Sequence, residues 1–153
     1  MAAIRDIIKL GDPLLRECAA QVRRFGPHLD NLLDDMAATM YEANGVGLAA
    51  PQIGISKCIL VADDGNGSGL IELINPVLLD TAGEASEVEY CLSVPGRGGE
   101  VIRAERVKVK AQDRQGESRV YEAEGWLARI FQHEIDHLHG RLFVDVMTRE
   151  VND

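Results

Sequence analysis

The 153-residue sequence has few aromatic residues, no long apolar run and only three cysteines. Its longest apolar run, Cys58 to Ala62, is far shorter than the roughly 18 residues that a membrane-spanning helix needs. The three cysteines are widely spaced and form no CxxC pair, which excludes a disulfide scaffold and favours a reducing compartment. The first residues lack the apolar block of a secretory signal. We therefore expect a cytoplasmic protein that does not associate with membranes.

Positive charge is also scarce. Lys and Arg total 16 against 25 Asp and Glu, so the formal net charge is -9. Because phosphate backbones repel an acidic chain on average, we expect no stable nucleic-acid binding. The remaining composition is that of an ordinary globular protein, and the length suffices for one sizeable core. We expect residues 1–153 to form a single domain.

Two amphipathic helices are expected at either side of a strand-rich middle. Apolar residues recur at helical spacing from about His28 to Ala43, and again from about Gly125 to His139. Strands are expected at Lys57–Ala62, Leu70–Ile74, Val101–Ile102, Val107–Lys110 and Ser118–Glu122, the last two as a hairpin. Asn75-Pro76 is expected to end the second of these strands. The pattern predicts an α+β fold, with antiparallel β-sheets packed around the C-terminal helix and an N-terminal amphipathic helix.

The C-terminal helical segment contains the sequence His133-Glu134-Ile135-Asp136-His137, an HExxH motif. Residues four apart on a helix lie one above the other, so both imidazoles can reach one metal ion. Glu134 is placed to take a proton from a metal-bound water and pass it to a leaving group. The alternative is a helix whose histidines are incidental.

Two histidines do not complete a catalytic site, which usually has three protein ligands. The metzincin pattern fails because Phe143 stands at the position of its last histidine, and a second ligand-bearing helix does not fit after His137. The upstream candidates are Cys18, Cys58, Cys91, His28 and the carboxylates. Cys58 lies in an apolar strand, and we expect Cys58 and Cys18 to be core thiols. Cys91 lies among polar and turn residues, and two imidazoles with one thiolate suit Zn, Fe(II) or Ni.

A glycine-rich segment, Gly45-Val46-Gly47-Leu48-Ala49-Ala50-Pro51-Gln52, follows the first expected helix. Its small residues allow close approach of a ligand, and its main-chain groups could bind an extended peptide. The Gln52 amide could face an oxyanion. A phosphate cradle is the weaker alternative, because the segment has neither GxGxxG nor GKS/T. A simple helix-to-strand connection would explain the glycines but not Gln52.

With these segments in view, the sequence closely resembles the peptide deformylase family. That family carries Gly-x-Gly-x-Ala-Ala-Pro-Gln, Glu-Gly-Cys-Leu-Ser and Gln-His-Glu-x-Asp-His in this order, and here they are Gly45–Gln52, Glu89–Ser93 and Gln132–His137. The resemblance also covers Asn75-Pro76, Arg103 and Leu142–Asp145. It implies removal of the formyl group from the N-formylmethionine of nascent polypeptides, with release of formate. Any ribosome contact is expected to be transient.

The resemblance also implies roles for individual residues. The metal ligands would be Cys91, His133 and His137, holding one divalent ion that is usually Fe(II) and often Zn or Ni. Glu134 would be the general base and then the acid, while the Gln52 amide and the Leu92 N–H would form the oxyanion hole. Main-chain groups near Val46, Gly47 and Tyr90 would pair with the substrate. The methionine pocket would be lined by Val46, Trp126, Ile130 and His133.

Three further expectations concern neighbours of these residues. Arg129 and Phe131 are expected to point away from the pocket, with Arg129 as a solvated charge. Tyr90 departs from the family glycine and could narrow the pocket.

This departure of Tyr90 motivates an alternative function, a metal-dependent amidase acting on another acyl group. A third hypothesis is a metal-binding protein without catalytic activity, against which Glu134 and Gln52 both argue.

Overall fold

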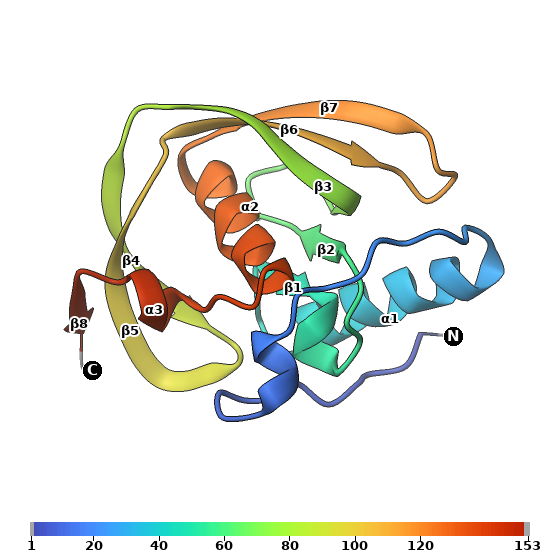
Figure 1. Cartoon of the computed structure of the whole chain (residues 1–153), viewed down its shortest axis with the longest axis horizontal. Coiled ribbons are helices and arrows are strands. Elements are labelled where there is room, and N and C mark those ends of the chain that lie inside the picture. The colour runs from blue at the N-terminus through green and yellow to red at the C-terminus, as the bar shows by residue number, and fades with distance from the viewer. Residues whose placement is uncertain (1, 152–153) are drawn as a thin grey trace.

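The computed structural model describes residues 2–151 and forms two antiparallel β-sheets with two long helices (Figure 1). The larger sheet has the order β1-β2-β3-β6-β7, and the smaller sheet has the order β4-β5-β8. The larger sheet consists of β1 (Gly47–Ala49), β2 (Ile59–Ala62), β3 (Ile71–Ala82), β6 (Arg106–Gln112) and β7 (Ser118–Glu124). The smaller sheet consists of β4 (Ala85–Cys91), β5 (Val94–Arg103) and β8 (Arg149–Val151). The expected α+β class is confirmed, and the β6–β7 hairpin is present.

The two long helices are α1 (Pro27–Glu42) and α2 (Gly125–Leu138), each within one residue of its expected bounds. Pro27 occupies the first turn of α1, where its missing N–H costs no hydrogen bond. The chain leaves α1 through Asn44, whose φ of 58° is in the left-handed region that asparagine tolerates. The shorter helical elements are α3 (Phe143–Val146) and the 3₁₀ turns Pro13–Arg16 and Ala50–Ile53. Within residues 2–151, no helix is both long and apolar enough to cross a bilayer.

Helix α2 lies inside the molecule, between the larger sheet and the smaller sheet (Figure 1). Leu60 and Val109 of the larger sheet pack in one core cluster with Phe131 and Ile135 of α2. A second cluster joins α1 to β1 and β2, and a third joins the smaller sheet to α3. Helix α2 packs on the larger sheet and binds the smaller sheet through Asp136 and Arg129, so side chains on one helix can meet residues that are far apart in the sequence.

Strand β3 continues through Asn75-Pro76, so the expectation that the strand ends there is wrong. The register with β6 shifts between Ile74 and Val77, which marks a bulge at Asn75 and Pro76. A bulge leaves residues unpaired, so it accommodates a proline that has no N–H. Asn75 has φ 53°, and its side chain accepts from Val22 N at 2.8 Å and donates to Val22 O at 3.0 Å. The bulge therefore attaches the segment that precedes α1 to the sheet.

The cysteines only partly follow expectation. Cys18 is exposed, so its expected place in the core is wrong, whereas Cys58 is half-buried and donates to Ala19 O at 3.4 Å. Burial raises the pKa of the Cys58 thiol, which keeps it protonated and unreactive. Cys18 lies in a segment without regular structure, where sequence periodicity gives no information about burial.

Replacement of Asn75 tests the anchoring role of the bulge. Asn75→Ala removes the hydrogen bonds to Val22 and puts alanine in the left-handed region, which alanine tolerates less well than asparagine, so we expect a loss of about 2–4 kcal/mol. Asn75→Gly keeps the backbone conformation accessible and should lose about 1–3 kcal/mol from the hydrogen bonds alone. Urea denaturation measures both. Equal stability of wild type and Asn75→Ala would contradict this account.

Candidate functional site

A cluster of three possible metal ligands lies where the end of β4 meets α2. Cys91 is the last residue of β4, and its Sγ lies 3.4 Å from His137 Nε2. The rings of His133 and His137 have centroids 5.2 Å apart on successive turns of α2. One ligand atom of each of the three residues lies within 4.8 Å of the others, and all three residues are buried. The expected third residue therefore lies beside the two histidines.

Two buried polar atoms at this cluster bear on whether a metal fits. Among the described residues, Glu134 Oε1 and His137 Nδ1 have no hydrogen-bond partner. Burial raises the pKa of Glu134 to about 7, a value suited to both accepting and returning a proton near neutral pH. A thiolate and two imidazoles are ligands that Zn²⁺ and Fe²⁺ accept, and a water on the metal would give the Glu134 oxygen a partner. The donor set and this oxygen therefore fit a catalytic metal.

The carboxylate of Glu89 holds the first histidine in place. His133 Nδ1 lies 2.8 Å from Glu89 Oε1, so Nδ1 donates to the carboxylate and Nε2 is the nitrogen available to a metal. Arg103 donates to both oxygens of Glu89 at 2.9 Å, and its Nη1 donates to Asp136 at 2.6 Å. Burial alone would raise the pKa of Glu89, but hydrogen bonds from Arg103 and His133 outweigh it and hold the pKa at about 2. Glu89 is therefore ionised in the interior.

Arg129 belongs to the same network, so the expectation that it is a solvated charge is wrong. It is 4% exposed, and its Nη1 donates to Glu89 Oε2 at 2.7 Å and to Val101 O at 2.8 Å. Its Nη2 donates to Ala85 O at 2.8 Å. Arg129 stands four residues before His133, and this spacing places both on one face of the helix. That spacing was the signal in the sequence that could have located Arg129.

The glycine-rich segment approaches α2 so closely that side chains are excluded. A Cβ on Gly47 would lie 2.7 Å from Glu134 Oε2 and 2.8 Å from Ile130 Cγ2. A Cβ on Gly45 would lie 2.7 Å from Leu92 Cδ1. Both glycines are therefore explained by close contact. The segment forms one wall beside Glu134, which a simple helix-to-strand connection would not require.

Gln52 extends this wall towards the cysteine. Its Oε1 accepts from Ala49 N at 2.9 Å, which turns Nε2 towards Ser93 Oγ at 3.2 Å and Cys91 Sγ at 3.6 Å. The side chain is 1% exposed. The amide N–H groups of Gln52 are thus held next to the ligand cluster.

A pocket of about 240 Å³ opens onto this cluster. It is lined by Asn44, Gly45, Val46, Gly47, Gln52, Tyr90, Cys91, Leu92, Trp126, Ile130, His133 and Glu134. These include every expected site residue except His137, which is fully buried beside Cys91. Phe131 packs in the core away from the pocket, as expected. The sequence motifs assign no role to Glu89, Arg103 and Asp136, which contact His133 or one another outside the pocket lining.

Tyr90 follows the alternation of β4 and is 53% exposed, whereas Glu89 and Cys91 on either side are buried. Its register partner on β5 is Gly98. A Cβ on Gly98 would lie 2.5 Å from Tyr90 Cε1, so the tyrosine ring rests on this glycine. Tyr90 also lines the pocket, and its ring extends from there over β5.

Two sheet edges border the pocket. β1 is an outer strand of the larger sheet and β4 is an outer strand of the smaller sheet. Their residues Gly47 and Tyr90 both line the pocket. Outer strands have one row of main-chain groups without a partner in the sheet, so an extended peptide could pair there.

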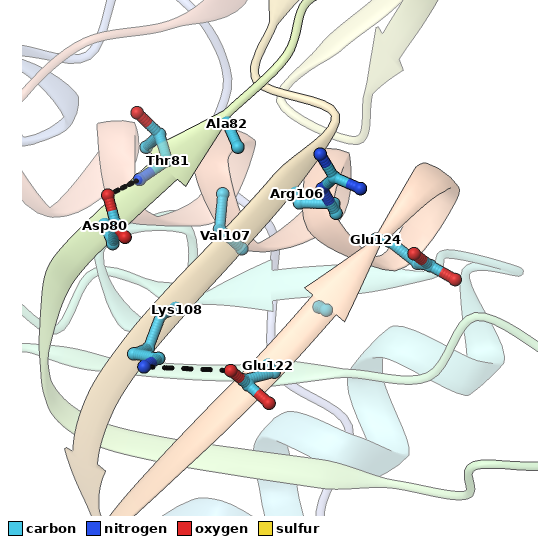
Figure 2. A pocket seen from close by; sticks show the side chains of 9 residues that line it. Asp80, Thr81, Ala82, Arg106, Val107, Lys108, Glu122 and Glu124 are labelled. Atoms are coloured by element: carbon cyan, nitrogen blue, oxygen red, sulfur yellow. Dashed lines mark hydrogen bonds and ion pairs between the residues drawn. The ribbon is translucent and has the colours of Figure 1, made fainter.

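A different hollow, of about 480 Å³, lies on the larger sheet and contains none of the expected site residues. Figure 2 shows that its side chains come from β3, β6 and β7, and that Lys108 reaches towards Glu122. The two side chains form an ion pair at 3.7 Å. Charges of both signs line this hollow, and the cluster of possible metal ligands found among residues 2–151 lies elsewhere.

Two imidazoles and a thiolate beside a carboxylate that is not a ligand define a metal-dependent hydrolase. The polypeptide deformylase family profile matches residues 4–153. The chain therefore belongs to the polypeptide deformylase family, which confirms the resemblance seen in the sequence.

Individual relatives agree with this assignment. The chain is 54% identical over 143 residues to a peptide deformylase of Carboxydothermus hydrogenoformans, covering 94% of this chain and 93% of the relative. It superposes on a Legionella pneumophila peptide deformylase with TM-score 0.92 and 48% identity, covering 95% and 87% of the two chains. The Met-Ala-Ser-bound class I type b peptide deformylase of Acinetobacter baumannii gives TM-score 0.92 and 39% identity, covering 96% and 100%.

Arg129→Met tests the buried network. The change leaves Val101 O and Ala85 O without their donor and removes one cation from a buried carboxylate, so we expect a loss of about 3–5 kcal/mol in unfolding free energy. The control Arg119→Met removes an exposed arginine that pairs with Asp113, and it should cost less than about 1 kcal/mol. Chemical denaturation of both metal-loaded variants makes the comparison. Equal losses in the two variants would refute a special role for Arg129.

Proposed function

We propose that this chain removes the formyl group from the N-formylmethionine of nascent polypeptides. The observation that carries the proposal is the placement of buried Glu134 beside Cys91, His133 and His137, in a pocket bordered by two outer strands. Water adds to the formyl carbon, the C–N bond breaks, and the products are formate and a peptide with a free amine.

Cys91, His133 and His137 would hold one divalent metal ion. When bound, such an ion lowers the pKa of water and polarises a carbonyl oxygen, so that a nucleophile is available at neutral pH. Glu89 keeps His133 in the required tautomer through Nδ1. Soft sulfur and imidazole ligands suit Fe(II), Zn and Ni, and we propose Fe(II) as the metal in the cell because deformylases resembling this chain usually use it.

Glu134 is the proposed proton carrier. Its carboxyl faces the pocket beside Gly47, and Oε1 has no partner among the described residues. We assign to it the uptake of a proton from the attacking water and the delivery of that proton to the leaving nitrogen. The pKa of about 7 suits both steps, since neither protonation state is strongly disfavoured near neutral pH.

Gln52 and Leu92 are the proposed oxyanion donors. The Gln52 amide is held by Ala49 and faces the cysteine, and the Leu92 main chain follows Cys91 directly at the pocket wall. As the formyl carbon becomes tetrahedral its oxygen gains negative charge, which two fixed N–H donors stabilise.

Peptide binding is assigned to the two outer strands. Main-chain groups of Val46 and Gly47 on one side and Tyr90 on the other would pair with an extended substrate. The methionine side chain would then contact Val46, Trp126, Ile130 and His133. The Acinetobacter baumannii peptide deformylase binds Met-Ala-Ser, which supports a peptide with an N-terminal methionine as the ligand.

We also propose that residues 1–153 act as one catalytic domain in the cytoplasm. The three cysteines are free, in keeping with a reducing compartment. With a net charge of -9, contact with the ribosome would be transient rather than a stable association with RNA.

Glu134→Gln tests the function and the proton carrier together. Formate release from formyl-Met-Ala-Ser, measured on protein loaded with Fe(II), Zn or Ni, should fall by about 10²–10⁴ in each case because the carboxylate base is lost. Metal content should stay at one ion per chain. The control Glu84→Gln changes an exposed carboxylate outside the pocket and should be fully active. No release by wild type with any of the three metals would refute the proposed function, and unchanged release by Glu134→Gln would refute the proposed role.

Tyr90→Gly tests the pocket wall. Removing the ring widens the outer pocket, so we expect kcat/KM for formyl-Met-Phe-Ser to rise about tenfold relative to formyl-Met-Ala-Ser. Tyr90→Phe retains the ring and should keep the wild-type ratio. A ratio that is the same in all three proteins would show that Tyr90 does not restrict the substrate.

A further inference from the structure

A groove of about 760 Å³ lies away from the metal cluster and contains none of its residues. It is formed by the segment before α1, the first turns of α1 and the segment that leads into β2. In Figure 1 the first of these segments runs from the centre of the molecule to the start of α1. The volume is in the range of ordinary ligand sites, which is about 300–1,000 Å³.

The charged residues of this groove are all cations. They are Arg5, Arg23, Arg24 and Lys57, although the chain has 25 acidic residues against 16 basic ones. Arg5 is paired with Asp35 at 2.8 Å. Arg23, Arg24 and Lys57 are exposed and form no ion pair with any residue of 2–151. The groove is therefore a local positive surface on an acidic protein, unlike the mixed charges of the hollow in Figure 2.

The floor of the groove is apolar. Leu29 and Leu32 come from α1, Val22 and Ile55 come from the two neighbouring segments, and Ile59 is the first residue of β2. Val22 and Ile55 are only partly buried, so their side chains remain accessible. An occupant that suits this lining has apolar groups on one side and negative charge on the other.

The segment before α1 also has unpaired main-chain groups. Ala20 N donates to Ser56 O at 3.0 Å, and both main-chain groups of Val22 bond to the Asn75 side chain. Successive residues of an extended segment direct their main-chain groups to opposite sides. The groups of Gln21 and Arg23 therefore face away from these partners, and no described residue bonds to them.

We propose that this groove binds an extended peptide that carries carboxylates and apolar side chains in alternation. Its main chain pairs with Gln21 and Arg23 as an added strand. Its apolar side chains lie on the floor between Leu29 and Ile55, and its carboxylates face Arg23, Arg24 and Lys57. This site lies outside the proposed deformylation site and does not depend on its chemistry.

A peptide suits the groove better than RNA does. Three unpaired cations provide few phosphate contacts, and the net charge of -9 repels a phosphate backbone. The groove lining contains no Phe, Tyr or Trp on which successive bases could stack, and its one aromatic ring is that of His28. The apolar floor and the free main-chain groups both match a polypeptide.

An NMR titration of the metal-loaded protein tests the proposal. The probe is the blocked peptide acetyl-Val-Asp-Leu-Asp-Val-Glu-amide, and the comparison peptide replaces each acidic residue by lysine. We expect amide shifts at residues 21–24 and 55–57 with the acidic peptide, and none there with the lysine peptide. Formate release from formyl-Met-Ala-Ser should be unchanged by saturating acidic peptide.

Two charge reversals provide matched variants. Arg23→Glu should weaken binding of the acidic peptide by about threefold to tenfold, since it replaces attraction by repulsion at the rim. Lys110→Glu makes the same charge change on β6, at an exposed residue outside the groove, and should leave binding unchanged. Both should retain wild-type deformylation.

Four results would overturn the proposal. The first two are the absence of binding and equal binding of the two peptides. The third is shifts confined to residues 45–47 and Trp126, which would place the peptide in the deformylation pocket. The fourth is tighter binding of a uridine hexanucleotide than of the acidic peptide. Failure of the deformylation assay alone would leave the groove shifts in place, so the two proposals fail separately.

Discussion

The geometry of the site depends on one buried carboxylate. Glu89 accepts from Arg103, Arg129 and His133 in an interior where an unpaired charge would be very unfavourable. Its position is therefore restrained from several directions at once. Because Glu89 and Cys91 are alternate residues of β4, the strand whose carboxylate orients His133 also brings the cysteine to the histidines.

The arginines extend this restraint from the strand to the helix. Arg103 bridges Glu89 of β4 and Asp136 of α2, while Arg129 links α2 to the main chain of the smaller sheet at Val101 and Ala85. These contacts join the two elements that supply the ligand cluster. On the other side of α2, β1 of the larger sheet lies in close contact with Glu134 because Gly47 has no side chain. The site is thus assembled from both sheets around one helix.

Sequence patterns predicted the helices and the site far better than they predicted these connections. Helical periodicity placed α1 and α2 within one residue, and local motifs named Cys91, His133 and Glu134, because both kinds of information are short-range. The continuation of β3 through Pro76 depends on a bulge and on Asn75 binding Val22, which are contacts between distant segments. The expected solvation of Arg129 is wrong because Glu89, Val101 O and Ala85 O together accept from its buried guanidinium. Contacts of this long-range kind carry no periodic signal.

The two outer strands beside the pocket also bear on self-association. Unpaired strand edges can join edges of other molecules, and this is the first step of many aggregates. Here β1 is only three residues long, and β4 carries the exposed Glu87. Both features disfavour the pairing of two copies, and the net charge of -9 adds repulsion between whole molecules. The protein can thus keep edges open for a passing chain without forming a continuous sheet with its own kind.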